Sequence, residues 1–151
     1  MASLLPGSAR LRSPAYAFIA IILASGCSPK SDEISILGEW EFVKSVYDGK
    51  EHVLRGRSTL RFTSVYIVYP HRKEPHDSYK LNQTETPRSI DVKVAQPGEA
   101  DDGKTMLGIY ELKGDDLLIC IAKPGLGRPK RLESEPGSGH NLMILKRSKA
   151  E

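Results

Sequence analysis

KTMLGIYELKGDDLLICIA, residues 104–122, is the stretch that decides the fold. Across Met106–Leu112 the residues alternate between two faces, which is typical of a β-strand. Gly114, which accepts a positive φ without a Cβ clash, is followed by two aspartates and predicts a tight turn. Leu117–Ile121 is apolar on both faces, as in a strand that is covered on two sides. The stretch therefore predicts a β-hairpin in a closed barrel or a sandwich.

Short runs of the same kind fill most of the remaining chain and are separated by turn residues. About eight short strands at intervals of roughly 8 to 12 residues predict an all-β domain, and no amphipathic helix of about three turns is evident. A single antiparallel, up-and-down barrel is preferred to a sandwich, because closure removes the edge strands, and few edge-protecting charges interrupt the apolar runs. The predicted strands lie within residues 36–47, 60–62, 65–69, 79–81, 89–94, 104–112, 117–121 and 141–147, and a minor strand begins at Leu132.

The first residues of the chain have the pattern of an export signal. Arg10 and Arg12 precede an apolar run, Ala15–Ala24, that is too short to span a bilayer. The run ends in LASGC, which resembles a bacterial lipobox, the signal in which the Cys becomes the first mature residue and is acylated. We therefore expect residues 1–26 to be a lipoprotein signal peptide and Cys27 to carry the lipid. The alternative is an ordinary secretory signal with a chance Cys.

A lipidated Cys27 predicts an exported protein that is anchored in the cell envelope, on the periplasmic face. Several acyl chains would hold it stably, and Ser28 is compatible with sorting to the outer membrane. Residues 27–35 are predicted to be a polar tether, 36–147 the β domain and 148–151 a C-terminal tail. Without Arg10 and Arg12, 20 basic residues face 19 acidic ones, so the net charge falls from +3 to +1. Such a charge does not favour nucleic acid as a partner.

Two groups of residues were considered for chemistry. His71, His76 and Asp77 share one charged loop and are possible metal ligands, but no further ligand spacing supports them, and a solvated loop is the preferred interpretation. Cys120 and His140 are a possible nucleophile and base. Because Cys120 lies in the most apolar strand, an inert core thiol is preferred. No metal site and no catalytic residue is predicted.

Two glycine-rich runs, residues 125–128 and 137–140, look superficially like phosphate-binding loops. Neither precedes a plausible helix, so the cluster of helix N-terminal amides that would hold a phosphate is missing. No cofactor is predicted.

A series of short motifs in order from Ile36 to Arg147 resembles a small uncharacterised domain found repeatedly in planctomycete proteins, a lipocalin-like all-β family. That family usually has a Gly-Asp type of turn where this chain has Thr63-Ser64. The resemblance implies a lipocalin-like barrel and an exported setting, and it implies no biochemical activity. The matching pieces are Leu37-Gly38-Glu39-Trp40, Asp48-Gly49-Lys50, Leu60-Arg61-Phe62, Pro87-Arg88-Ser89-Ile90-Asp91, Gly108-Ile109-Tyr110-Glu111-Leu112, Gly114-Asp115-Asp116-Leu117, Cys120, Pro124-Gly125, Arg128-Pro129 and Gly137-Ser138-Gly139.

The lipocalin likeness predicts one specific contact. In barrels that begin with Gly-x-Trp, the indole closes one end and a cation from the last strand often lies across it. Here Gly38 and Trp40 form that motif, and we predict that Arg147 lies within about 6 Å of the Trp40 ring. The alternative is a solvated charge at a strand end. Structural roles are predicted for Gly38, Trp40, Gly108, Tyr110, Gly114, Asp115 and Arg147.

The candidates for ligand binding are aromatic and charged residues of the family-like motifs: Trp40, Asp91, Tyr110, Glu111 and Arg128. The charged ones either line a pocket or tie loops together, and loop architecture is preferred. If a site exists, it is expected between the strand of Trp40 and the loop around Arg128. The predicted function is a non-catalytic binding or interaction module, with a small apolar ligand or an envelope protein as its partner; the alternative is a small hydrolase-like enzyme. A barrel filled by its own side chains would favour protein contacts on the loops.

Overall fold

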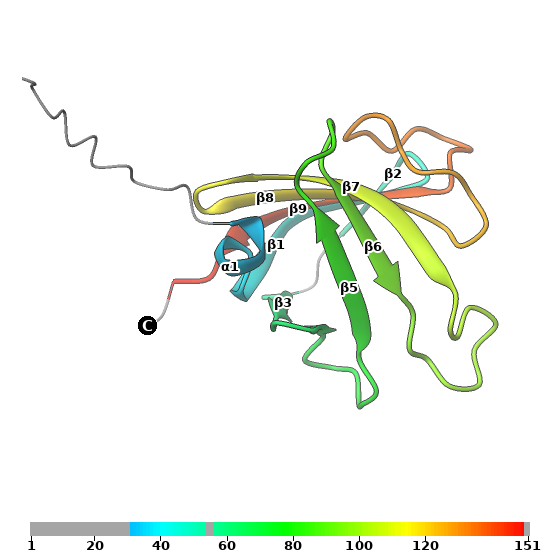
Figure 1. Cartoon of the computed structure of the whole chain (residues 1–151). Helices are drawn as coiled ribbons and strands as arrows, with labels where there is room; N and C mark the ends of the chain where they lie inside the picture. Colours follow the sequence, from blue (N-terminus) through cyan, green and yellow to red (C-terminus); the bar gives the residue numbers. More distant parts are fainter. Residues whose placement is uncertain (1–30, 54–55, 150–151) are drawn as a thin grey trace, which may run out of the picture.

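Nine antiparallel strands and one short helix make up residues 31–53 and 56–149, the part of the chain that the computed structural model describes (Figure 1). The predicted signal peptide and Cys27 lie outside these residues. The elements are α1 (Asp32–Ser35), β1 (Gly38–Tyr47), β2 (Lys50–His52), β3 (Thr59–Phe62), β4 (Tyr66–Val68), β5 (Asp77–Asn82), β6 (Ser89–Lys93), β7 (Thr105–Lys113), β8 (Asp116–Ala122) and β9 (His140–Arg147).

The strands form a closed barrel, because β1 pairs with β9 as well as with its neighbours in sequence. β9 pairs with β1 from Trp40 to Tyr47. Along the other edge of β1, β3 pairs with Gly38–Glu41 and β2 pairs with Ser45–Tyr47. Eight strands therefore close the barrel and β2 is an additional strand, which confirms the predicted antiparallel, lipocalin-like barrel.

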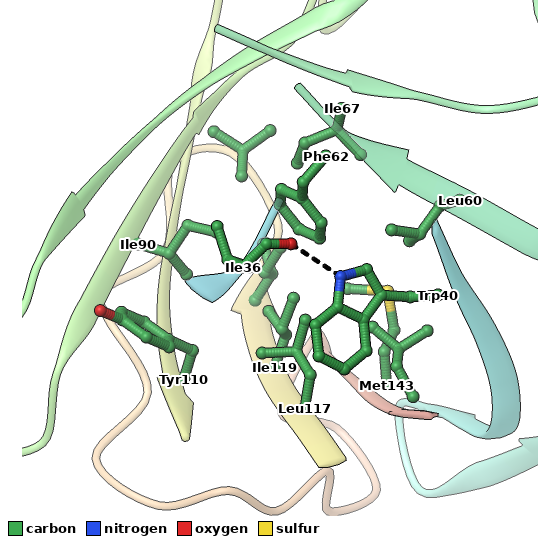
Figure 2. Packing of buried hydrophobic residues seen from close by; sticks show 13 residues of the cluster. Ile36, Trp40, Leu60, Phe62, Ile67, Ile90, Tyr110, Leu117, Ile119 and Met143 are labelled. Carbon is green, nitrogen blue, oxygen red and sulfur yellow. Dashed lines mark hydrogen bonds between the residues drawn. The ribbon is translucent and has the colours of Figure 1, made fainter. Parts of the chain in front are cut away.

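The inside of the barrel is filled by its own side chains (Figure 2). Trp40, Phe62 and Tyr110 supply the largest buried rings, and Phe62 packs edge-on against the ring of Tyr79, with 5.0 Å between the ring centres. Burial of so much apolar surface is the main stabilising term of such a fold. The buried cluster comprises Ile36, Trp40, Leu60, Phe62, Ile67, Ile90, Val92, Tyr110, Leu117, Ile119, Ile121, Met143 and Leu145.

The connection between β8 and β9, residues 123–139, covers part of the outer surface of β7 and β8, and we call it the strap. Ile109, Cys120 and Ala122 point away from the inside of the barrel, because their neighbours in the strands point into it. They are nevertheless buried. The strap therefore explains why this hairpin is apolar on both faces. The minor strand predicted at Leu132 is wrong, because this part of the strap forms no strand. Its Glu133 carbonyl accepts a hydrogen bond from the Cys120 thiol and not from the backbone of a neighbouring strand.

The barrel has two ends, which differ in what covers them. The α1 end carries α1, the turn 63–65, the loop 83–88 and the turn between β7 and β8; the loop end carries the connections 69–76, 94–104 and the strap. Antiparallel pairing puts successive connections at opposite ends. The tether predicted over residues 27–35 is wrong for Asp32–Ser35, which form α1 and pack on the barrel, because the Asp32 side chain has partners there.

Candidate functional site

At the α1 end, Trp40 is fully buried and lies beneath Arg147. The indole Nε1–H donates to the Ile36 carbonyl at 2.8 Å, the dashed line in Figure 2. The guanidinium carbon of Arg147 lies 4.2 Å from the centre of the Trp40 ring. Arg147 also donates to the Leu37 carbonyl at 3.0 Å and pairs with Asp115 at 3.3 Å. This arrangement confirms the predicted contact between Arg147 and Trp40, and it holds the chain after α1 onto the last strand.

Three of the glycines given structural roles occupy positions where a side chain would be costly. Gly38 has φ +115°, and a Cβ there would lie 3.4 Å from the Arg147 guanidinium. A Cβ at Gly108 would lie 2.9 Å from the Cys120 carbonyl oxygen. Gly114 has φ +59° in the turn between β7 and β8, which is the left-handed region that glycine enters freely.

Beside Trp40, the carboxylate of Asp32 joins α1 to the barrel wall. It accepts hydrogen bonds from the Tyr110 hydroxyl at 2.8 Å and from Arg88 at 2.8 Å. Burial, and then the hydrogen bond to Asp32, raise the pKa of Tyr110. The sequence pattern puts Asp32 in the predicted tether and does not indicate this role. The available signal was a Ser followed by two acidic residues, which is typical of a helix start.

At the loop end, Arg72 and Asp77 form a second cluster of this kind. Arg72 donates to both carboxylate oxygens of Asp77, at 2.9 and 2.6 Å, and lies 5.1 Å from the centre of the Tyr69 ring. The Ala95 amide also donates to Asp77, at 2.8 Å. Burial, and then the nearby Asp77 carboxylate, raise the pKa of Tyr69 to about 12.

The prediction that the charged loop from His71 to Asp77 is solvated is therefore wrong for Asp77, which is buried at the start of β5. The bidentate pair with Arg72 offsets the cost of burying its charge. His71 is exposed, as that prediction requires.

The candidate ligand-binding residues do not form one site. Asp91 pairs with Arg128 at 2.7 Å on the outside of the barrel, and Glu111 pairs with Lys113 at 2.8 Å. Trp40 and Tyr110 are core residues. Trp40 lies at the α1 end and Arg128 in the strap, so the structure does not bring these two side chains together. The site expected between the strand of Trp40 and the loop around Arg128 stays a prediction.

Arg128 instead fastens the strap to the barrel. Besides Asp91, it donates to the carbonyl of Gly108 at 2.6 Å and to that of Ile90 at 3.3 Å. A guanidinium that binds backbone carbonyls of two neighbouring strands and a carboxylate has a structural role. The Asp91–Arg128 pair agrees with the interpretation in which these charges tie loops together.

The strap also accounts for Cys120. The thiol is fully buried and donates to the Glu133 carbonyl at 3.2 Å. Burial raises its pKa, so the thiol stays protonated and is a weak nucleophile. His140 lies at the start of β9, opposite Ala122, and the described contacts do not join it to the thiol.

A depression at the α1 end has a volume of about 560 Å³ and is open to solvent. Asp32, Arg88, Asp115 and Arg147 line it, and these four groups already make the ion pairs given above. Its polar lining is therefore mostly engaged within the protein. Across residues 31–53 and 56–149, no three His, Cys, Asp or Glu side chains are grouped so that they would hold a metal ion.

Comparison with protein-family models, with curated proteins and with solved structures finds no match. The resemblance to the planctomycete domain family therefore stays an expectation from the motifs quoted above. Among the described residues, no helix is long and apolar enough to cross a membrane.

Proposed function

We propose that the protein is an exported lipoprotein, anchored through Cys27, and that it acts as a non-catalytic module that contacts another protein of the cell envelope. We place it, as part of the same proposal, in the planctomycete lipocalin-like domain family. The lipobox-like LASGC supports the anchor. The choice of a protein as the partner rests on one structural observation: the inside of the barrel is filled by its own side chains.

Carriers of small apolar ligands need an interior cavity with a few polar groups. In this barrel, Trp40, Phe62 and Tyr110 occupy the interior. Both ends are also covered, by Arg147 over Trp40 and by Arg72 over Tyr69. These features favour contacts on the outer surface and the connections, where large partners bind, over a ligand held inside.

Acylation is tested on the full chain expressed in a bacterial host. We expect mass spectrometry to show a mature chain that begins at an acylated Cys27, found in the membrane fraction. The Cys27→Ala variant should lose the lipid and leave that fraction, and the matched Cys120→Ala variant should keep both. An unmodified Cys27 in a membrane-bound chain would overturn the anchor.

The filled barrel is tested separately, on the chain purified from membranes. Native mass spectrometry should give the mass of the acylated chain without a bound small molecule. A photo-crosslinking amino acid in place of the exposed Leu126 of the strap should give discrete protein adducts in cells, and one in place of the buried Ile119 should give none. A stoichiometric apolar molecule that co-purifies would instead show a carrier.

A further inference from the structure

The distance between the proposed anchor and the domain is short. Four peptide units separate Cys27 from Ser31, and a fully extended chain of that length reaches at most about 14 Å. Ser31 directly precedes α1, and Asp32 is bound to the barrel by Tyr110 and Arg88. Given the proposed lipid at Cys27, on which this inference rests, the domain has little freedom to turn away from the membrane.

The turn 63–65 lies next to α1 and exposes apolar side chains. Val65 is 49% exposed and Tyr66, the first residue of β4, is 47% exposed. Ser64 from this turn and Glu33 from α1 line the same depression, of about 520 Å³. The turn is therefore on the side of the barrel from which the tether leaves. Tyr66 also lines a second depression, with Glu74, Pro75 and His76 of the connection 69–76.

The same turn is held firmly. The Thr63 hydroxyl accepts from the Tyr66 amide at 2.8 Å and donates to the Tyr66 carbonyl at 3.1 Å. The Tyr79 hydroxyl donates to the Thr63 carbonyl at 2.7 Å. Val65 and Tyr66 are thus presented on a rigid turn, so little conformational entropy is lost when they bind a surface.

The type of these two residues suits the boundary of a bilayer. Tyr has an apolar ring and a polar hydroxyl, and it is enriched at the level of the lipid headgroups. Glu33 and Lys80 line the neighbouring depression with charges of opposite sign, so the contact should not require anionic lipid. The other large, exposed apolar residues of the described chain, Val43, Val53 and Leu126, lie on other elements.

We propose that the α1 end faces the membrane that holds the anchor, with Val65 and Tyr66 at the level of the lipid headgroups. The strap and the connection 94–104, at the loop end, then point away from the bilayer. This orientation assigns the partner-binding surface of the proposed function to the loop end.

The test uses tryptophan as a probe of depth. Two full-length variants, Tyr66→Trp and Leu126→Trp, are expressed, purified as the acylated chain and reconstituted into phosphatidylcholine vesicles that contain a headgroup spin-labelled lipid. Leu126 lies in the strap at the loop end and is 44% exposed, which makes it a matched control. The wild-type chain, with Trp40 alone, gives the background to subtract.

We expect the spin label to cause a loss of fluorescence in the Tyr66→Trp variant and little change in the Leu126→Trp variant. Vesicles with added phosphatidylglycerol should give the same difference. Equal quenching of both probes, or stronger quenching of the Leu126→Trp variant, would overturn the proposed orientation while leaving the anchor intact.

A second preparation separates this inference from the anchor itself. The mature chain, beginning at Cys27, is coupled through that thiol to a maleimide lipid in the same vesicles; Cys120 is buried and does not compete. If cells do not acylate Cys27, the proposed function fails in the mass measurement. The probes in the coupled chain would still show whether the α1 end or the loop end meets the bilayer.

Discussion

The two ends of the barrel are closed by the same chemistry, assembled from different parts of the chain. At the α1 end, Arg147 lies over Trp40 and pairs with Asp115, residues that come from the last strand, the first strand and a turn. At the loop end, Arg72 lies over Tyr69 and pairs with Asp77, all from one short segment. In both, an arginine covers an aromatic ring and satisfies carbonyl or carboxylate oxygens around it.

The difference concerns how each end depends on the rest of the fold. The α1 end forms only when β1 and β9 are paired, because Trp40 and Arg147 are register partners across that pair. The loop end forms within the connection between β4 and β5 and then binds Ala95 of the neighbouring connection. We therefore expect the α1 end to report on global stability and the loop end to respond to local changes in charge.

The largest effect is expected for Trp40→Ala. Removal of a fully buried indole should lower the free energy of unfolding by about 3–5 kcal/mol, measured by urea denaturation followed by circular dichroism. Val43→Ala, at a residue of the same strand that is 60% exposed, is the matched control and should change little. A loss below about 1 kcal/mol for Trp40→Ala would mean that the α1 end does not govern global stability.

The buried carboxylates of the two ends should differ in their effect. Asp77→Ala should cost about 3 kcal/mol, because Arg72, with its side chain only 25% exposed, loses its partner. Asp32→Ala should cost about 1–2 kcal/mol, because Arg88 is 44% exposed and can be hydrated. Thermal and urea unfolding give both values, with the exposed Asp101→Ala as the control. The opposite order would mean that the exposure of the two arginines does not decide the cost of losing their carboxylate partners.

Stability should fall at alkaline pH through one tyrosine at each end, the partly buried Tyr69 and the buried Tyr110. The pKa of Tyr69 is raised to about 12 and that of Tyr110 is raised as well. Above pH 10 the unfolded chain loses these protons while the folded chain keeps them, so the free energy of unfolding falls by up to about 1.4 kcal/mol per pH unit for each tyrosine. The contribution is complete below pH 10, and for Tyr69 it is lost as the pH rises through about 12.

Urea unfolding between pH 9 and pH 11.5 measures this slope. Tyr69→Phe should flatten it, since one raised pKa is removed, and Tyr66→Phe, at an exposed residue, should not. An unchanged slope in Tyr69→Phe would show that the loop end does not bury this phenol in solution.

A smaller effect is expected at the strap. Arg128→Ala removes its bonds to Gly108, Ile90 and Asp91, and should cost about 1–2 kcal/mol and increase the rate at which Cys120 reacts with a thiol reagent under native conditions. Lys130→Ala, at an exposed neighbour, is the control. If Cys120 remains as protected as in the wild type, Arg128 does not hold the strap.

The smallest effect is expected for Glu111→Gln. The pair with Lys113 is solvent-exposed, and such pairs contribute about 0–1 kcal/mol. Unfolding of this variant should coincide with that of the wild type. A clear loss of stability would instead place Glu111 in an interaction that the pair with Lys113 does not explain.

The barrel and the α1 end were largely predictable, because alternation along the strands determines which residues face inward. The contact of Arg147 with Trp40 was implied by the lipocalin likeness, in which a cation from the last strand often covers the indole of a Gly-x-Trp motif. Asp32 and the Arg72–Asp77 pair were not predictable in this way. Asp32, Arg72 and Arg88 lie outside the strands. The position of such segments depends on tertiary packing that short-range patterns do not encode.

The candidate ligand-binding residues show the same limit. Asp91 and Arg128 were correctly considered as a contact that ties loops together, since opposite charges in loops commonly pair. Their distance from Trp40 could not be read from the sequence, because it depends on how far the strap extends over β7. These residues were grouped because they belong to the family-like motifs.

The pairing of β1 with β9 has a consequence for the order of events during synthesis. The first strand must wait for the last one, which begins about 100 residues later at His140, before the barrel can close. A nascent chain that lacks β9 leaves the edge of β1 unpaired and Trp40 without Arg147 above it. The barrel therefore stays open until β9 has been synthesised, and an open chain is the state that the export proposed above would require.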